Sequence, residues 1–219
     1  MYIIAKWNMK NKNYTGLFIA FEGLDGSGAS IQASLLSGML KKTGYRVELT
    51  KEPTHNLIGG LIKAQLTGEW KTSQECLQLL FASDRAQHLQ NLIIPSLENG
   101  KIVITDRYVL SSIAYGSTNS SDIKWLRNVN DIFILPDITF LVKVSPKICS
   151  MRLRKTKYEM GLYNQEDKLK KVWDIYDKLS KIYKNIYVID GERDEVEIIN
   201  EINNILYKKL GINKKLDKY

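Results

Sequence analysis

Short blocks of consecutive apolar residues alternate along this chain with longer segments in which apolar residues recur every three or four positions. Short blocks that run into glycine or polar residues are typical of buried parallel strands, and the longer periodicity is typical of amphipathic helices. The alternation predicts an α/β fold with a five-stranded parallel sheet and helices on both faces. The predicted strands are Leu17–Phe21, Tyr45–Thr50, Lys101–Thr105, Ile138–Val144 and Ile186–Ile189.

Helical spacing connects these strands. The first helix begins near Ser30 and should end at Gly44, since glycine is the usual residue just past a helix. The longest helix starts at Ser73 and runs to Asn99, and Pro95 is expected to kink it because proline donates no backbone hydrogen bond. The other predicted helices are Leu57–Leu66, one starting at Ser111–Tyr115, Asp122–Val129, Pro146–Arg154, Glu166–Tyr183 and Asp194–Leu210.

These segments predict one domain, residues 17–212, with short additions. Residues 1–16 form an extension before the first strand, and 213–219 form a basic tail. A polar, glycine-bearing stretch at about 152–165 is a candidate lid. The extension lacks the apolar core and cleavage site of a signal peptide, and no stretch approaches the ~20 apolar residues of a membrane span. A cytoplasmic protein without a membrane anchor is therefore expected.

The net charge of +8 admits two interpretations, a nucleic-acid partner or a site that holds several phosphates. Most lysines are spread along predicted helices, which favours solvated faces over a nucleic-acid footprint. Cys76 and Cys149 lie far apart without metal-ligand spacing, and two reduced, buried thiols are expected. His55 and His88 also lack companions that could ligate a metal.

A glycine-rich turn between the first strand and the first helix matches most of the phosphate-loop pattern G-x-x-x-x-G-K-[ST]. Gly23, Gly28 and Ser30 occupy its fixed positions, but Ala29 stands at the lysine position. Glycines let backbone N–H groups converge on phosphate oxygens, although such a turn is sometimes only structural. The residues expected to hold ATP are Gly23, Asp25, Gly26, Ser27, Gly28, Ala29, Ser30 and Ile31.

Polar clusters follow two further strands, Lys51-Glu52-Pro53 and Asp106-Arg107-Tyr108. Ligands of parallel α/β sheets bind beyond the carboxyl ends of the strands, so both clusters should lie near the glycine-rich turn. Asp106 is placed to hold Mg²⁺ together with the Ser30 hydroxyl. Arg107 can clamp a phosphate, and a structural ion pair is the alternative.

Phe81 and Arg85 are four residues apart and share a helix face, where a ring and a guanidinium could hold a base. On spacing alone, Phe81 in the core and Arg85 in a surface ion pair is the better interpretation. The basic residues Arg152, Arg154, Lys155 and Lys157 could close over a triphosphate, although such a run is more often a solvated helix end.

Four segments together resemble the thymidylate kinase family of nucleoside-monophosphate kinases, over roughly 17–208. They are Phe21–Gly28, Lys51–Pro53, Leu80–Leu89 and Asp106–Tyr115. The resemblance implies a three-layer P-loop NTPase fold and transfer of the ATP γ-phosphate to dTMP with Mg²⁺, giving dTDP. It also implies a homodimer, often through helices such as 73–94.

By this resemblance, Phe81 would stack on thymine, Arg85 would bond its O4 edge and Ser112 would lie near N3. Tyr115 would exclude a ribose 2′-hydroxyl. The dTMP site it implies consists of Asp25, Pro53, Phe81, Arg85, Arg107, Ser112, Tyr115 and Tyr176.

The resemblance assigns the sugar 3′-hydroxyl to Asp25, flanked by Tyr176, and the acceptor phosphate to Arg107. Arg152 and Arg154 match lid arginines. The catalytic set it implies is Asp25, Asp106, Arg107, Arg152 and Arg154, and the Mg²⁺ set is Ser30 and Asp106.

Departures from the family pattern fall mainly on the ATP side. Ala29 replaces the lysine, Ser27 is not basic, and the lid lacks the family's Asp-Arg-x-Glu pattern. Removing one preorganised donor typically costs about 10²–10³ in rate, so a slow dTMP kinase is expected. The alternatives are a nucleotide-binding protein without turnover and a kinase of another deoxynucleotide. Candidates to cover for the lysine are Lys51, Arg107 and the lid cations. The chain also differs from the residues usual in the family at four further positions, Ile31, Lys51, Gly116 and Lys143.

Overall fold

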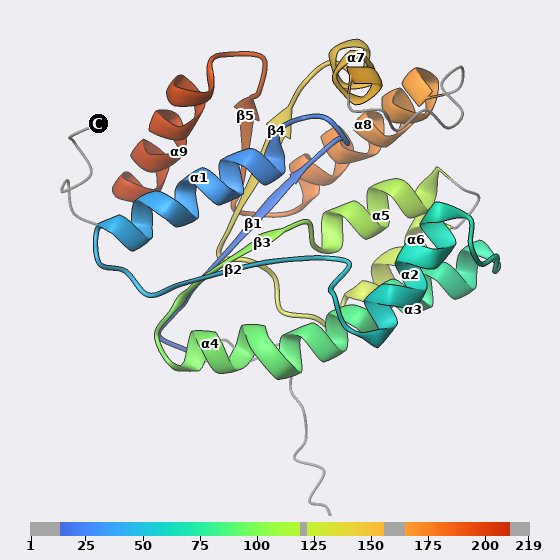
Figure 1. Cartoon of the computed structure of the whole chain (residues 1–219), viewed down its shortest axis with the longest axis horizontal. Coiled ribbons are helices and arrows are strands. Elements are labelled where there is room, and N and C mark those ends of the chain that lie inside the picture. Colours follow the sequence, from blue (N-terminus) through green and yellow to red (C-terminus); the bar gives the residue numbers. More distant parts are fainter. Residues whose placement is uncertain (1–13, 119–121, 156–164, 211–219) are drawn as a thin grey trace, which may run out of the picture.

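The computed structural model describes residues 14–118, 122–155 and 165–210 (Figure 1). Most of the expected extension, the centre of the expected lid and the basic tail lie outside these residues. The sheet is five-stranded and parallel, with the order β2-β3-β1-β4-β5. Its strands are β1 (Leu17–Gly23), β2 (Val47–Lys51), β3 (Ile102–Asp106), β4 (Ile138–Lys143) and β5 (Ile186–Asp190).

The central strand β1 is buried from Phe18 to Gly23, which explains its unbroken apolar run. Its register aligns Phe21 with Asp106 of β3, and β2 aligns Lys51 with the same aspartate. The strand alignments thus bring the glycine-rich turn, Lys51 and Asp106 to one edge of the sheet. All three predicted polar clusters occupy this edge.

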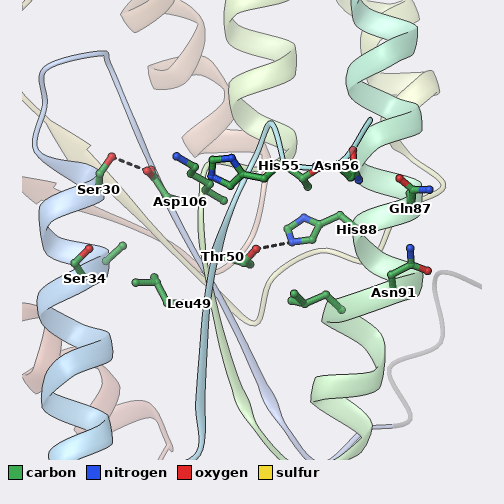
Figure 2. A pocket seen from close by; sticks show the side chains of 14 residues that line it. Ser30, Ser34, Leu49, Thr50, His55, Asn56, Gln87, His88, Asn91 and Asp106 are labelled. Carbon is green, nitrogen blue, oxygen red and sulfur yellow. Dashed lines mark hydrogen bonds between the residues drawn. The ribbon is translucent and has the colours of Figure 1, made fainter. Parts of the chain in front are cut away.

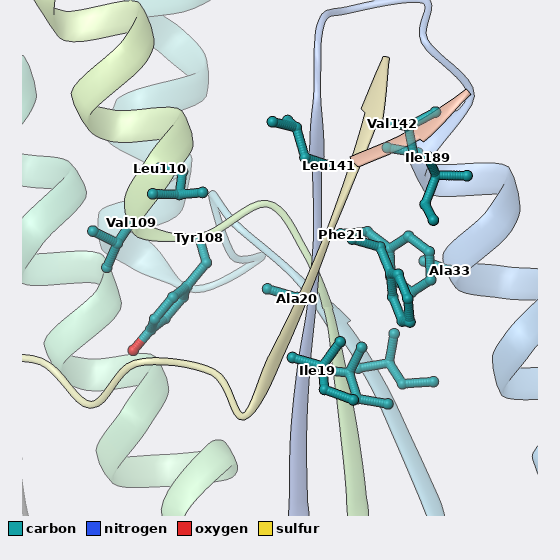
Figure 3. Packing of buried hydrophobic residues seen from close by; sticks show 14 of the residues in the cluster. Ile19, Ala20, Phe21, Ala33, Tyr108, Val109, Leu110, Leu141, Val142 and Ile189 are labelled. Atoms are coloured by element: carbon teal, nitrogen blue, oxygen red, sulfur yellow. The ribbon is translucent and has the colours of Figure 1, made fainter. Parts of the chain in front are cut away.

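Helices cover both faces of the sheet (Figure 1). On one face Phe21 and Ile189 pack toward Ala33 of α1, and on the other Ala20 faces Tyr108 at the start of α5 (Figure 3). The helices are α1 (Ala29–Lys42), α2 (Leu57–Thr67), α3 (Gln74–His88), α4 (Ile94–Glu98), α5 (Val109–Ser117), α6 (Ile123–Asn130), α7 (Pro146–Lys155), α8 (Gln165–Ile182) and α9 (Glu195–Leu210).

The long helix predicted from Ser73 is interrupted. Ser73 caps α3 by accepting a hydrogen bond from the Cys76 amide, as predicted for a helix start. A π-helical turn, η1 (Leu89–Ile93), then separates α3 from α4. Pro95 lies in the first turn of α4, where its missing N–H is tolerated. The interruption expected at Pro95 therefore takes the form of a wide turn just before it.

Cys76 and Cys149 are both free thiols; Cys149 is buried, as expected, whereas Cys76 is only half-buried. Burial raises the pKa of the Cys149 thiol to about 11. Within the described ranges, no helix combines the length and the apolar composition needed to cross a membrane.

Candidate active site

The glycine-rich turn has a backbone that side chains would obstruct. A Cβ at Gly23 would lie 2.6 Å from the Ser27 hydroxyl and 2.8 Å from the Val142 carbonyl oxygen. Gly28 adopts a left-handed φ of 89° as the residue before α1. The turn therefore leads directly into the first residue of α1, whose positive N-terminal end suits an anion.

A cavity of about 490 Å³ opens beside this loop. Arg152 of α7 spans its wall and donates to the carbonyls of Gly26 (3.2 Å), Ser27 (3.3 Å) and Gly191 (3.4 Å). The predicted ATP residues in the lining are Gly26, Ser27, Gly28, Ser30 and Ile31, together with Arg152.

The other residues predicted for ATP lie elsewhere. Gly23 is buried behind the loop, and Ala29 is only 6% exposed and packs into the core. Arg154 is exposed on α7 but does not line the 490 Å³ cavity beside the loop. Asp25 faces the neighbouring cavity instead.

Ser30 and Asp106 are in direct contact. The Ser30 hydroxyl donates to Asp106 Oδ2 over 2.6 Å (Figure 2). Asp106 Oδ1 is buried without a hydrogen-bond partner among the described residues. A hydroxyl beside a carboxylate with an unused oxygen fits a hard divalent cation such as Mg²⁺, which takes oxygen ligands.

A second cavity, of about 330 Å³ and here called the acceptor cavity, lies on the other side of the loop. It gathers seven of the eight predicted acceptor residues: Asp25, Pro53, Phe81, Arg85, Arg107, Ser112 and Tyr115. Glu52, Tyr108, Ser111 and Lys168 also line it. The seven acceptor residues come from four separate stretches of the chain and meet in one place, as a small-molecule site requires.

Arg85 is 1% exposed, so the interpretation of a surface ion pair is wrong. Its Nε donates to Glu52 Oε2 (2.9 Å) and one terminal nitrogen donates to the Ser112 hydroxyl (2.9 Å). The other terminal nitrogen donates to the Asn130 side-chain carbonyl. Phe81, one turn away, is half-buried and lines the same cavity. These partners fix the guanidinium against the cavity wall before any ligand enters.

Arg107 joins the acceptor cavity to the loop. Its guanidinium donates to Asp25 Oδ1 (2.6 Å), the Gly23 carbonyl (3.0 Å) and the Ser111 hydroxyl (3.1 Å). Burial alone would lower the pKa of Arg107, but Tyr115, Asp25 and other neighbours raise it well above its ordinary value. The side chain is therefore a permanent cation, held in the second cavity against Gly23 and Asp25 of the glycine-rich turn.

The sequence patterns did not single out Glu22 as a functional residue. This buried carboxylate accepts hydrogen bonds from the Tyr108 amide (2.9 Å), the Ser111 amide (3.2 Å) and the Tyr176 hydroxyl (3.0 Å). The Ser111 hydroxyl also donates to it. Burial raises the pKa of Glu22. The only sequence signal is an acid directly after the apolar run Leu17–Phe21, at a position that the structure makes part of β1.

Tyr176 belongs to the Glu22 cluster and does not line the acceptor cavity. It is fully buried behind Tyr115, with the two rings edge to face at 6.5 Å. Tyr115 itself lines the cavity, and its hydroxyl accepts a hydrogen bond from the Asp25 amide (2.9 Å). Tyr176 therefore supports the wall from behind.

Glu52 anchors the opposite side of the acceptor cavity, and the patterns also left its role unassigned. It pairs with Arg85 through Oε2 and contacts His88 Nδ1 at 3.1 Å through Oε1. The other ring nitrogen of His88 lies 2.8 Å from the Thr50 hydroxyl (Figure 2). His88 is buried.

A phosphate-binding loop next to an arginine-lined acceptor cavity is the arrangement of a P-loop kinase that phosphorylates a small molecule. Comparison with known proteins narrows this class. A family model described as thymidylate kinase matches residues 21–202.

The chain is 39% identical over 203 residues to a probable thymidylate kinase of Thermococcus kodakarensis, an alignment that spans 89% of this chain and 99% of that protein. It is 36% identical over 199 residues to a thymidylate kinase of Thermosipho africanus, over 89% and 99% of the two chains. The chain therefore belongs to the thymidylate kinase family of nucleoside-monophosphate kinases, as its motifs predicted.

Proposed function

We propose that this protein transfers the γ-phosphate of ATP to dTMP, giving dTDP and ADP. One observation carries the proposal: Arg85 and Arg107 are fixed by partners in one cavity, which adjoins the glycine-rich loop. The proposed kinase domain is 17–212, with its lid at about 152–165.

The base end of the acceptor cavity suits thymine. Phe81 offers a ring for stacking, and Arg85 offers only hydrogen-bond donors. Thymine O4 is an acceptor and matches Arg85, whereas cytosine presents a donor amino group at that position. Ser112 holds Arg85 and would lie beside the same edge of the base. The site should therefore accept dTMP and reject dCMP.

The sugar and phosphate would lie between Tyr115 and Arg107. Tyr115 is fixed by the Asp25 amide, so its ring can exclude a 2′-hydroxyl without moving. Arg107 neutralises the acceptor phosphate and holds it in line with the donor. Asp25 is half-exposed and can exchange its contact with Arg107 for the sugar 3′-hydroxyl.

Phosphoryl transfer needs positioning and charge neutralisation more than proton transfer. An oxygen of the acceptor phosphate attacks the γ-phosphorus, the bond to the β–γ bridging oxygen breaks, and ADP leaves. The acceptor oxygen is already anionic, so no general base is required. Arg152 holds the outer side of the loop, and Arg154 on the same helix is proposed to join it at the triphosphate.

Mg²⁺ bound with ATP supplies further neutralisation of phosphate charge. Among the described residues there is no cluster of three or more His, Cys, Asp or Glu side chains suited to a metal. Ser30 and Asp106 are the proposed ligands, in keeping with the habit of Mg²⁺ to rely on one or two carboxylates plus substrate phosphates.

Asp106→Asn should lower the rate by about 10²-fold and raise the Mg²⁺ concentration needed for half-maximal activity, because the amide is a weaker Mg²⁺ ligand. Mg²⁺ titrations at fixed ATP and dTMP measure both effects. Asp131→Asn, on the distant end of α6, is the matched control and should leave the titration unchanged. An unaltered Mg²⁺ requirement in Asp106→Asn would remove Asp106 from the metal site.

The proposed function is tested by ADP formation with a panel of acceptors: dTMP, dUMP, dCMP, dGMP and thymidine. We expect turnover with dTMP, weaker turnover with dUMP because it lacks the apolar 5-methyl group that thymine would bury in the cavity, and none with dCMP. ADP formation at the same rate with and without each acceptor would contradict the proposed kinase activity. Faster turnover with thymidine or dUMP than with dTMP would reassign its acceptor.

We also propose a homodimer in the cytoplasm, a location that the two free thiols suit. Large apolar side chains are exposed on α2 and α3, among them Leu57 (83% exposed), Leu61 and Leu79. An exposed apolar surface of this kind marks an interaction site. Light scattering on a sizing column should give twice the chain mass, and Leu61→Asp should give the monomer. A monomer of wild-type protein at tens of micromolar would contradict the dimer.

A further inference from the structure

The structure leaves open which cation serves the ATP phosphates, because Ala29 packs into the core and the loop carries no basic side chain. In P-loop enzymes, a lysine of the loop cradles the β- and γ-phosphates. A replacement must lie beside Ser30 and Asp106, where the triphosphate and its metal would be held. It must also have a charged end that is not already engaged.

Most basic side chains around the loop are engaged among the described residues. Arg152 is held by three backbone carbonyls, and Arg107 by Asp25. Arg193 pairs with Asp190 and Glu201. Lys143 lies over the Trp173 ring, with its ammonium 5.8 Å from the ring centre. Each of these side chains would have to give up a partner to reach the triphosphate.

Lys51 satisfies both conditions. It is the last residue of β2, and the strand register places it directly beside Asp106 of β3. It is exposed, and no hydrogen bond or ion pair within the described residues engages its ammonium. The cationic end is therefore free to reorient on its long stem.

The cavity around Lys51 includes the proposed metal ligands. This cavity, of about 680 Å³, lies between α1, β2 and α3, and both Ser30 and Asp106 line it (Figure 2). Lys51 is its only lysine or arginine among the described residues. Strand side chains alternate, so Lys51 shares a face with Leu49, which lies opposite Ser34 of α1 (Figure 2). Lys51 therefore points to the side of the sheet that carries the first turn of α1.

We propose that Lys51 binds the ATP phosphates in place of the lysine absent at Ala29, reaching them from the neighbouring strand across Asp106. The inference rests on the proposed ATP-dependent kinase. The positive charge comes from outside the loop, on the side of Ser30 and Asp106. Lys168 differs because it lines the acceptor cavity and not the cavity of the metal pair.

The test measures ATP binding without any acceptor, so that it stands apart from turnover. Titration calorimetry with a non-hydrolysable ATP analogue and Mg²⁺ compares wild type with Lys51→Met, Lys51→Arg and the control Lys181→Met. Lys181 is an exposed residue of α8 paired only with Asp177 among the described residues. Lys51→Met should weaken analogue binding about tenfold or more and lower kcat by about 10². Lys51→Arg and Lys181→Met should stay within about threefold of wild type.

Two further measurements separate this role from a structural one. The affinity for dTMP should stay within twofold in Lys51→Met, which also shows that the variant is folded. The double variant Ala29→Lys/Lys51→Met should recover at least tenfold in analogue affinity, because the charge returns inside the loop. Unchanged analogue affinity in Lys51→Met would overturn the proposal, as would an equal loss of dTMP affinity or no recovery in the double variant. Absence of dTDP formation by wild type would instead overturn the kinase, and the calorimetry would still test Lys51.

Discussion

Replacing Arg107 with methionine is expected to lower kcat/KM for dTMP by about 10³-fold, at the upper end of the cost of losing one preorganised charged donor. Arg107 donates hydrogen bonds to Asp25, the Gly23 carbonyl and the Ser111 hydroxyl beside the acceptor cavity. Its loss removes the charge that holds the acceptor phosphate in line. Steady-state kinetics over a range of dTMP at saturating ATP measure the effect.

Arg107→Met should cost less stability than the loss of a buried ion pair, because Asp25, the carboxylate that pairs with Arg107, is 51% exposed and stays solvated, although the buried Glu22 also loses a nearby positive charge. Arg107→Lys keeps the charge without the forked geometry and should fall between wild type and Arg107→Met. Arg127→Met, on α6 beside the Tyr183 ring, is the control. A loss of less than tenfold in Arg107→Met would show that another group binds the acceptor phosphate.

Replacing Arg85 with methionine is expected to destabilise the protein by about 3–5 kcal/mol, since it leaves Glu52 as a buried charge without its main partner. The side chains of Arg85 and Glu52 are 1% and 3% exposed, and they approach to 2.7 Å. The Arg107–Asp25 pair is more exposed than the Arg85–Glu52 pair, so Arg107→Met should cost less stability than Arg85→Met. Urea denaturation monitored by circular dichroism gives the free energy of unfolding.

The double variant Arg85→Met/Glu52→Gln should recover part of the lost stability, because no buried charge then remains unpaired. It should not recover discrimination between dTMP and dCMP, which depends on the donors of Arg85. A cost below 1 kcal/mol in Arg85→Met would contradict the buried pair. Retained rejection of dCMP in the double variant would show that base recognition lies elsewhere.

The elements that local pattern controls were predicted from the sequence. Continuous apolar runs such as Leu17–Phe21 became buried parallel strands, and the glycine-rich stretch became a turn that leads into α1. The carboxyl-end rule for parallel sheets then brought Asp106 and Lys51 together, as the register confirms. These predictions succeeded because each depends on neighbours in the sequence or on the handedness of the fold.

The hydrogen-bond networks around the buried Glu22 and Glu52 were not predicted, because the partners of these carboxylates are distant in the sequence. Glu22 binds Ser111 and Tyr176, 89 and 154 residues away, and Glu52 binds Arg85, 33 residues away. Spacing gave Arg85 only a helix face, and surface and buried positions on that face look alike until the partner carboxylate is known. The role of Arg85 in base recognition was predicted from the family resemblance and not from its spacing in the sequence.

The burial of Tyr176 follows from a local pattern, the helical spacing of apolar residues along α8. Leu169, Val172, Tyr176 and Leu179 follow helical spacing along α8 and are all buried. That periodicity places Tyr176 on the core face of the helix, so its position behind Tyr115 could have been predicted. Pro95 is the opposite case, because a proline predicts an interruption but not the π-helical turn that provides it.

The central claim is that a P-loop enzyme with alanine at the lysine position still transfers phosphate to dTMP. Incubating the wild-type protein with γ-labelled ATP, Mg²⁺ and dTMP, then separating the nucleotides, tests it most directly. We predict labelled dTDP that rises with time, in an amount equal to the ADP formed, and that disappears when dTMP is omitted. No labelled dTDP at micromolar enzyme, while dTMP and ATP both bind, would contradict the claim.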